Sequence, residues 1–372
     1  MKILRVCLVI AAVLGFSHPV EACRFTVREI AYSILSQTKF SLVIIDKNKS
    51  IDTPAIQEIS SCEKYTNMNV VLLNPETDRK HPFFDIASTA GLDLPAYFLL
   101  APNNTILPLE QGRSLSDKEL KETFQHTILN STLRNQFLDH AHASFARVLL
   151  IHGNDAEQNK EAAAIIRDNC MQIKDLMPLM PKEIQTPPSL LEVTREQFKK
   201  EKVFLWSLGL DTLQNEPRAV VLYGRGRLMG QPLSYPEIKK GGAYKYMTLI
   251  GADCECGIDR KWMLGRQGLL KWDLQASQQL ATELGFDVDS PSILAEMSRI
   301  IAKEIDEENV NTISFGPENI NVDLAFGLNH APEDEVDDDD DSLFYIVLFG
   351  SLGILVLLIL MASVWYWKHT RQ

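Results

Sequence analysis

The sequence predicts an α/β protein with two tandem domains, a helical C-terminal extension and one transmembrane helix. Three observations predict this class. Short apolar runs typical of buried strands alternate with helix-start signals, the alternation occurs twice, and one long uncharged apolar stretch lies near the C-terminus. With 372 residues, the chain has room for two ordinary cores between its terminal segments.

The first apolar run, Val6–Phe16, follows Lys2 and Arg5 and leads to Ala22. As a helix it would be roughly 16 Å long, too short for a hydrocarbon core of about 30 Å. A basic start, a short apolar run and a small residue form the pattern of a secretory signal peptide. We therefore expect residues 1–22 to be removed and the remainder to be exported.

The first α/β copy is expected within residues 23–135, where strand and helix signals follow one another. The predicted elements are strands Phe40–Ile45 and Met68–Leu73, a helix from Thr53 and Pro54 towards Tyr65, strands Tyr97–Leu100 and Thr105–Leu107, and a helix from the capping box at Ser116 to about Leu129.

The second copy, residues 136–270, repeats the order with an insertion rich in Met and Pro at 177–188. Its predicted elements are strand Arg147–Ile151, helix Ala156–Asn169 capped by Asn154, strand Val203–Leu208, and strands Ala219–Tyr223 and Leu228–Met229. The turn between the last two strands, Gly224-Arg225-Gly226-Arg227, lacks the Lys-Ser/Thr of a phosphate-binding loop. We interpret it as a basic hairpin turn whose arginines can meet an acidic partner.

The C-terminal part is expected to be helical and then polar. Leu274–Leu284 and the stretch opened by Ser290 and Pro291 have helical periodicity, which predicts a helical extension over residues 271–305. Residues 306–342 are predicted to be a disordered acidic stalk. This segment holds much of the net charge of −12, because Glu333 to Glu335 and Asp337 to Asp341 are all acidic.

The last apolar stretch, Leu343–Val364, is uncharged and long enough to cross a bilayer. We expect a transmembrane helix over residues 343–367, which makes the membrane bilayer a partner. Because Lys368 and Arg371 follow the stretch and acidic residues precede it, residues 368–372 are predicted to be cytoplasmic. The protein would then lie in the cell membrane as a single-pass protein with its body outside the cytoplasm, in the periplasm of a bacterial host.

At Leu94-Pro95-Ala96-Tyr97-Phe98-Leu99 the chain resembles the thioredoxin-like superfamily, over roughly residues 38–130 and more faintly 145–232. The resemblance implies a mixed sheet flanked by helices in each copy, with Pro95 in the cis form. That family carries Cys-x-x-Cys at the start of its first helix, where the helix dipole lowers a thiol pKa. Residues 49–54 and 152–156 contain no cysteine. The tandem domains therefore lack the usual chemistry of disulfide exchange, which favours use of the fold as a scaffold.

Five cysteines remain after the signal is removed, an odd number for an oxidising compartment. Cys254 and Cys256, one residue apart, can form an easily reduced small-ring disulfide or offer two thiolates to copper or zinc. Alternatively each bonds to a distant cysteine, which makes Cys23, Cys62 and Cys170 candidate structural residues. Whether Cys23 is lipidated stays open.

The function that the sequence predicts is a membrane-anchored, extracytoplasmic, non-catalytic binding or scaffold module, accessory to a transport or envelope complex. No cofactor is expected, and a membrane protein is the expected partner. A nucleic-acid partner is excluded because no basic stripe with interleaved aromatic residues occurs. The alternative is an atypical thiol–disulfide enzyme or copper-handling protein that uses Cys254 and Cys256.

Overall fold

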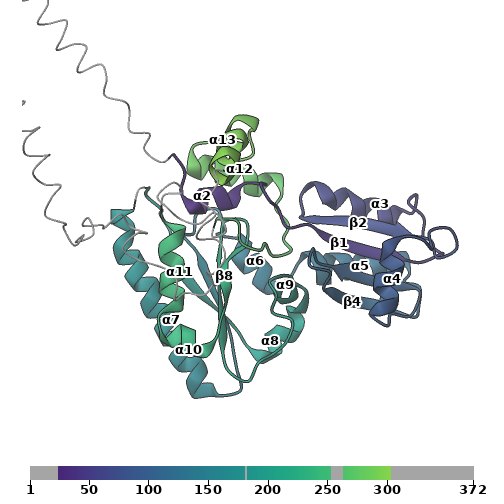
Figure 1. Ribbon diagram of the computed structural model, residues 1–372, viewed down its shortest axis with the longest axis horizontal. Helices are drawn as coiled ribbons and strands as arrows, with labels where there is room; N and C mark the ends of the chain where they lie inside the picture. The colour runs from purple at the N-terminus through teal and green to yellow at the C-terminus, as the bar shows by residue number, and fades with distance from the viewer. Residues whose placement is uncertain (1–23, 181, 253–262, 303–372) are drawn as a thin grey trace, which may run out of the picture. The chain divides into compact units, whose positions relative to one another are not determined.

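The computed structural model describes residues 24–180, 182–252 and 263–302, and its first domain is a four-stranded sheet with helices on both faces (Figure 1). Its elements are β1 (Phe40–Ile45), α3 (Pro54–Ser61), the 3-10 turn η1 (Cys62–Lys64), β2 (Met68–Leu73), α4 (Pro82–Thr89), β3 (Ala96–Leu100), β4 (Ile106–Gln111), α5 (Asp117–Thr123) and the π-helical turn η2 (Phe124–Leu129).

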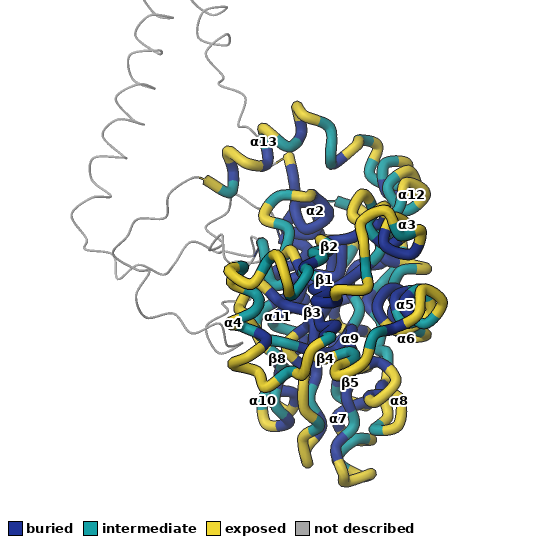
Figure 2. Tube along the Cα trace, turned by 90° about the vertical axis from the view of Figure 1, so that its right-hand side faces the viewer, coloured by how far each residue is buried: buried dark blue, intermediate teal, exposed yellow. Residues whose placement is uncertain are grey.

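The alternation of side chains along β1 divides the first core into two layers. Leu42 and Ile44 face α3 and α5, while Val43 and Ile45 face the side covered by α4. Strand order is β2-β1-β3-β4; β1 and β2 are parallel and the other neighbours are antiparallel. The central strands β1 and β3 are accordingly among the most deeply buried segments of this domain (Figure 2).

The second domain repeats this sheet and adds more helices around it. Its elements are α6 (Thr132–Leu138), β5 (Arg147–Ile151), α7 (Ala156–Leu176), the 3-10 turn η3 (Met177–Leu179), β6 (Ser189–Val193), α8 (Arg195–Lys200), α9 (Lys202–Ser207), β7 (Arg218–Tyr223), β8 (Arg227–Leu233), α10 (Tyr235–Lys239) and α11 (Gly242–Ile250).

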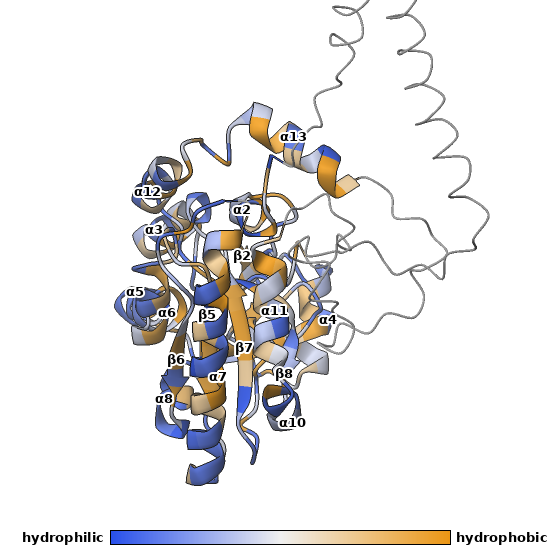
Figure 3. Cartoon of the chain, turned by 90° about the vertical axis from the view of Figure 1, so that its left-hand side faces the viewer, coloured by the Kyte–Doolittle hydropathy of each residue, from blue (hydrophilic) through white to orange (hydrophobic). Residues whose placement is uncertain are grey.

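The order of this second sheet, β6-β5-β7-β8, and its strand directions match those of the first. Helices α7 and α11 pack on one face, and α6, α8 and α9 pack on the other. The central strand β7 is almost wholly apolar, whereas α7 turns a hydrophilic face outwards (Figure 3). Two mixed sheets, each flanked by helices, are therefore present, as the sequence indicates.

Segments from both ends of the described chain complete the second domain. Helix α2 (Val27–Tyr32) opens with a capping box between Thr26 and Glu29 and is buried along its whole length. It shares the core of the second sheet with α12 (Leu274–Leu284) and α13 (Pro291–Ala302) (Figure 1). The residues before β1 thus pack on the second domain, although the sequence groups them with the first.

One predicted strand is wrong. Val203–Leu208 forms most of α9 rather than a strand, and the parallel partner of β5 is β6. The reason is physical, because a buried run of five apolar residues and one serine suits a core helix as well as a core strand. The true strand is a half-exposed edge that includes Ser189 and Glu192, so it lacks the apolar signal.

The fold class predicted from the sequence, which includes one transmembrane helix, is corrected by the structure. Among the residues described, every helix is too short or too polar to cross a membrane. The fold of the described chain is therefore two mixed α/β domains with a helical extension and without a membrane-spanning helix. Leu343–Val364, the signal peptide 1–22, the stalk 306–342 and the tail 368–372 lie outside the described residues.

Candidate functional site

The tip of the first domain, between β1 and α3, is the place where the family carries its thiols. Here Asp46, fully buried directly after β1, accepts hydrogen bonds from the Tyr97 and Ser114 hydroxyls. It also accepts one from the backbone N–H of Asn48 at 2.8 Å. Burial and the hydrogen bond to Asp46 raise the pKa of Tyr97 to about 12. The tip is a closed polar network without a nucleophile.

The loop opposite this tip carries the implied proline geometry. The Leu94–Pro95 peptide bond is cis, as the resemblance implies. The Pro95 carbonyl accepts a hydrogen bond from the N–H of Gly112 at 2.9 Å, which ties the loop to the end of β4. The fold therefore keeps the proline turn that the resemblance implies, while residues 49–54 contain no cysteine.

The tip of the second domain is closed by backbone contacts. Asp155, rather than the predicted Asn154, caps α7, and its carboxylate accepts from the N–H groups of Glu157 and Gln158 at 2.9 and 3.2 Å. The N–H of Asn154 donates to the Asn215 carbonyl at 2.6 Å. A Cβ on Gly153 would lie 2.3 Å from that same oxygen. This tip has no space for a bound substrate chain.

The two cysteines that the structure describes are buried free thiols in different cores. The Sγ atom of Cys62 lies 2.6 Å from the Tyr65 hydroxyl, and burial raises the pKa of the Cys170 thiol to about 12. Because the other cysteines of the exported chain lie outside the described residues, a structural disulfide at Cys62 or Cys170 stays a prediction. Cys23, Cys254 and Cys256 lie outside the described residues, so the thiol or metal role of the last two stays a prediction.

The arginines of the β7–β8 turn are not available to an acidic partner, which corrects the sequence interpretation. Arg227 is fully buried and donates to backbone carbonyls of residues 31, 33, 35, 36 and 265, the shortest being 2.6 Å to Leu35. Burial lowers its pKa to about 10. Arg225, also buried, pairs with Asp289. Gly226 is required between them, because its φ is +69° and a Cβ would lie 2.1 Å from Leu270.

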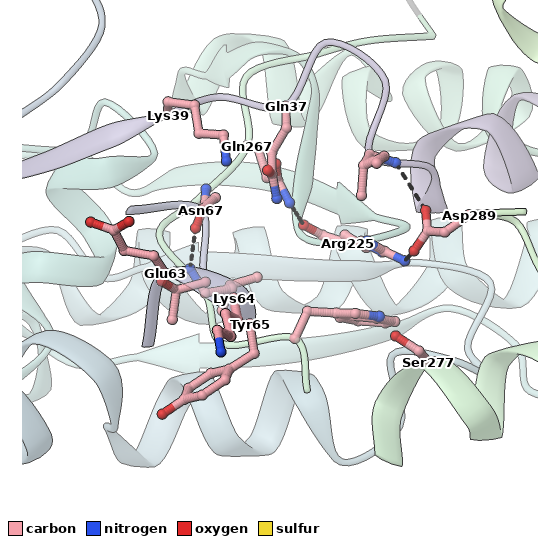
Figure 4. Close-up of a pocket in the computed structure, with 14 residues that line it drawn as sticks. Gln37, Lys39, Glu63, Lys64, Tyr65, Asn67, Arg225, Gln267, Ser277 and Asp289 are labelled. Carbon is pink, nitrogen blue, oxygen red and sulfur yellow. Dashed lines mark hydrogen bonds and ion pairs between the residues drawn. The ribbon is translucent and has the colours of Figure 1, made fainter. Parts of the chain in front are cut away.

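A pocket of about 470 Å³ lies where the first domain meets the β7–β8 turn and the C-terminal segment. We call it the interdomain pocket (Figure 4). One side consists of Lys39 and residues 63–67, and the other includes Arg225, Gln267, Trp272 and Asp289. No signal in the sequence marked these positions as a group, because they come from four separate stretches of the chain.

Backbone and side-chain hydrogen bonds fix the walls of the interdomain pocket. The buried Asn67 amide donates to the Gly268 carbonyl at 2.9 Å and accepts from the Leu270 N–H at 3.0 Å. The N–H of Trp272 donates to the Tyr65 carbonyl at 2.7 Å. An indole–guanidinium contact, with 5.1 Å between the Arg225 Cζ atom and the Trp272 ring centroid, closes the far side. The pocket is therefore preformed.

The pocket wall contains polar atoms that the protein leaves unpaired. Arg225 Nε, Gln267 Oε1 and Trp272 Nε1 are buried without a hydrogen-bond partner in the described structure. Such an atom costs about 1–3 kcal/mol when it stays unsatisfied. All three residues belong to the lining of the interdomain pocket, and these atoms lie beneath its surface.

Metal ligation has no support within residues 24–180, 182–252 and 263–302. No three His, Cys, Asp or Glu side chains come together there as a possible ligand set. Copper or zinc binding by Cys254 and Cys256 remains a prediction, because both lie outside those ranges.

The similarity of this chain to known proteins is low both by identity and by TM-score. No family model and no curated protein matches the sequence. The first two thioredoxin domains of Naumovozyma dairenensis Eps1p are similar at 10% identity with a TM-score of 0.18, covering 59% of this chain and 92% of that one. The bb fragment of ERp72 is similar at 11% identity with a TM-score of 0.19, over 52% and 80% of the two chains. Human ERp44 shows 13% identity and a TM-score of 0.21, over 59% and 55%.

The fold assignment itself comes from the geometry described above. Each sheet has one parallel and two antiparallel neighbour pairs in the same order, and a cis-proline precedes β3. Both domains are thioredoxin-like on this basis.

Proposed function

We propose that this protein is a thioredoxin-like binding module that does not exchange disulfides through either helix tip. The observation that carries the proposal is the replacement of the family thiol by a polar or acidic group in both domains. Asp46 fills the first tip with a hydrogen-bonded network, and Asp155 caps the helix that opens the second. A fold alone does not confer an activity, and here the reactive group is missing.

The capping carboxylate makes the second tip especially unsuited to thiol chemistry. A reactive thiolate is stabilised by the partial positive charge of a helix N-terminus. At α7 that position is already taken by the side chain of Asp155, which bonds two of the free N–H groups. A negative sulfur there would face a carboxylate instead of an unpaired helix end.

Neither described cysteine compensates for this loss. Cys170 lies in the second core with a pKa raised to about 12 by burial, so almost no thiolate forms at neutral pH. Cys62 follows the end of α3, away from the N-terminus whose dipole would help it. Among the residues that the structure describes, the chain therefore offers a ligand-binding surface, and the interdomain pocket is the binding site we assign to it.

A disulfide-reduction assay tests the proposal. The full-length protein, incubated with insulin and dithiothreitol, should give the rate of the uncatalysed reaction. Multiple turnovers of insulin reduction would contradict the proposal. In that case the variant Cys254→Ser/Cys256→Ser tells whether the alternative thiol function resides in those two residues.

Thiol titration gives a second, independent measure. At pH 8 Cys170 should react with a chromogenic disulfide reagent only after unfolding in guanidinium, because burial suppresses its thiolate. A Cys170→Ser variant identifies its contribution. Rapid modification of Cys170 in the native protein would show that its thiol is reactive, which would contradict this prediction. The expected extracytoplasmic location and the accessory role in a transport or envelope complex stay predictions.

A further inference from the structure

We infer that the interdomain pocket binds a small solute carrying an oxyanion, a carboxylate or a phosphate, with Lys39 and Lys64 as its cationic partners. The inference rests on the proposed binding function and names the chemistry of its ligand. It follows from charges, hydrogen-bonding groups and size, which are considered in turn.

The charges that line the pocket sum to a positive value. Arg225 and Asp289 pair with each other, while Glu63 accepts from the Val70 N–H at 2.6 Å and keeps its negative charge. Lys39 and Lys64 line the same pocket, and neither has an ion-pair partner in the part of the chain that the structure describes. Two lysines and one glutamate leave a net positive charge for a ligand, which favours an anion.

The two lysines precede different strands, and both line one opening. Lys39 directly precedes β1, and Lys64 ends the turn before β2, which is the parallel neighbour of β1. Asn67 lies between their side chains in the close-up (Figure 4). Two flexible ammonium groups at one opening can contact the same oxyanion.

Hydrogen-bonding side chains in the lining also suit an oxyanion. Gln37 and Ser277 line the pocket, and an amide N–H or a hydroxyl donates to an anionic oxygen.

The size of the pocket limits the ligand to a small molecule. Its volume of about 470 Å³ lies within the usual range for small-molecule sites, roughly 300–1,000 Å³. The hydrogen bonds of Asn67 to Gly268 and Leu270 hold the walls together. A preformed pocket of this size takes a metabolite-sized anion and leaves no room for a polymer chain.

Calorimetric titration of the full-length protein with sodium phosphate and with sodium citrate, at low ionic strength, tests the inference. We expect saturable binding of at least one probe, and the stronger of the two identifies whether phosphate or carboxylate is the preferred source. Lys39→Gln and Lys64→Gln should each weaken binding roughly two- to fivefold, the range of a partly exposed charge pair. Lys118→Gln on α5, whose side chain is 86% exposed and outside the pocket, is the matched control.

A second pair of variants separates charge from folding. Ser277 lines the pocket on α12, so Ser277→Asp adds a negative charge there, whereas Ser277→Asn adds a similar volume without charge. We expect Ser277→Asp to weaken binding about tenfold and Ser277→Asn to change it little, with both variants unfolding at the same denaturant concentration. Equal affinities of these two variants would overturn the inference.

The titrations test the oxyanion inference separately from the insulin assay, which tests the proposed function. Failure of both probes to bind, or unchanged affinity of the two lysine variants, overturns the oxyanion inference and leaves the absence of disulfide exchange intact. Catalysed insulin reduction overturns the proposed function whatever the titration shows.

Discussion

The two domain tips differ in how they are closed, although both belong to the same fold. In the first domain, side chains close the tip, since Asp46 gathers the hydroxyls of Tyr97 and Ser114. In the second, the backbone closes it, because Gly153 and Asn154 lie directly against the 215–217 segment. One scaffold thus excludes thiol chemistry by two unrelated arrangements, and each arrangement can be broken separately.

The two domains also differ in the helices that pack on their sheets. The first has eight-residue helices α3 and α4 on its sheet, whereas α7 of the second has 21 residues. Only the second sheet shares its core with α2, α12 and α13. The Arg227 side chain connects these parts, because its carbonyl partners lie in α2, in the segment after it and in the loop at Gly265.

Arg227→Met should have the largest effect on stability. It leaves several buried carbonyls without a donor and detaches α2 from the β7–β8 turn. Loss of a buried, multiply bonded charge costs about 3–5 kcal/mol. Denaturant unfolding followed by far-UV circular dichroism measures the change. Arg113→Met, at an exposed surface ion pair, should change the free energy of unfolding far less. Equal effects of the two variants would show that Arg227 does not fasten the terminal segments.

Asp46→Ala should have the next largest effect, and it acts on the first domain. The variant leaves the buried hydroxyls of Tyr97 and Ser114 without their acceptor, which costs about 2–3 kcal/mol. The counterpart in the second domain, Asp155→Ala, removes an exposed helix cap worth about 1 kcal/mol. Unfolding midpoints of both variants compare the tips directly. If Asp155→Ala lowers the free energy of unfolding as much as Asp46→Ala, the two carboxylates stabilise their tips equally, contrary to this prediction.

Local sequence patterns predicted a helix correctly where a single feature, such as a capping residue, marks its start. The capping box at Ser116 and the Thr53-Pro54 pair mark α5 and α3 where the structure has them. The failures involve long-range packing. Val203–Leu208 became a helix because it packs between the two domains, where Trp206 lies 5.7 Å from Phe40 between ring centroids. No short window of sequence carries that information.

The residues of the candidate site depend even more on packing between segments that are far apart in the sequence. The arginines of the 224–227 turn looked like an exposed basic patch, since glycines and arginines are typical of solvated turns. Their burial depends on α2 and the 263–272 segment, which are far away in sequence. Lys39 and Lys64 show no pattern at all, because their proximity arises only when β1 and β2 pair.

Gly153→Ala should disturb the second tip to a smaller extent. A Cβ there would lie 2.3 Å from the Asn215 oxygen, so the two loops must separate, at a cost of about 1–2 kcal/mol. Ser50→Ala, at an exposed position of the first tip, is the matched control and should be nearly neutral. Amide hydrogen exchange localises the effect: protection should fall at Asn154, whose N–H bonds Asn215. Unchanged protection there would contradict closure by the backbone.

Alkaline pH should also act on the first tip, where its effect is measured as a slope. The pKa of Tyr97 is raised to about 12 in the folded protein, against about 10 in an unfolded chain. Between these values the folded state binds more protons, so the stabilisation is complete below pH 10 and is lost as pH rises towards 12. Tyr97→Phe should therefore make the fall of unfolding free energy over this window shallower, by less than about 1.4 kcal/mol per pH unit. Ser114→Ala keeps the phenol but removes a hydrogen bond that lowers the Tyr97 pKa, so its slope should be at least as steep as that of the unmodified protein. An equal slope in Tyr97→Phe would mean that the alkaline transition belongs to other tyrosines with a raised pKa, such as Tyr65 or Tyr223.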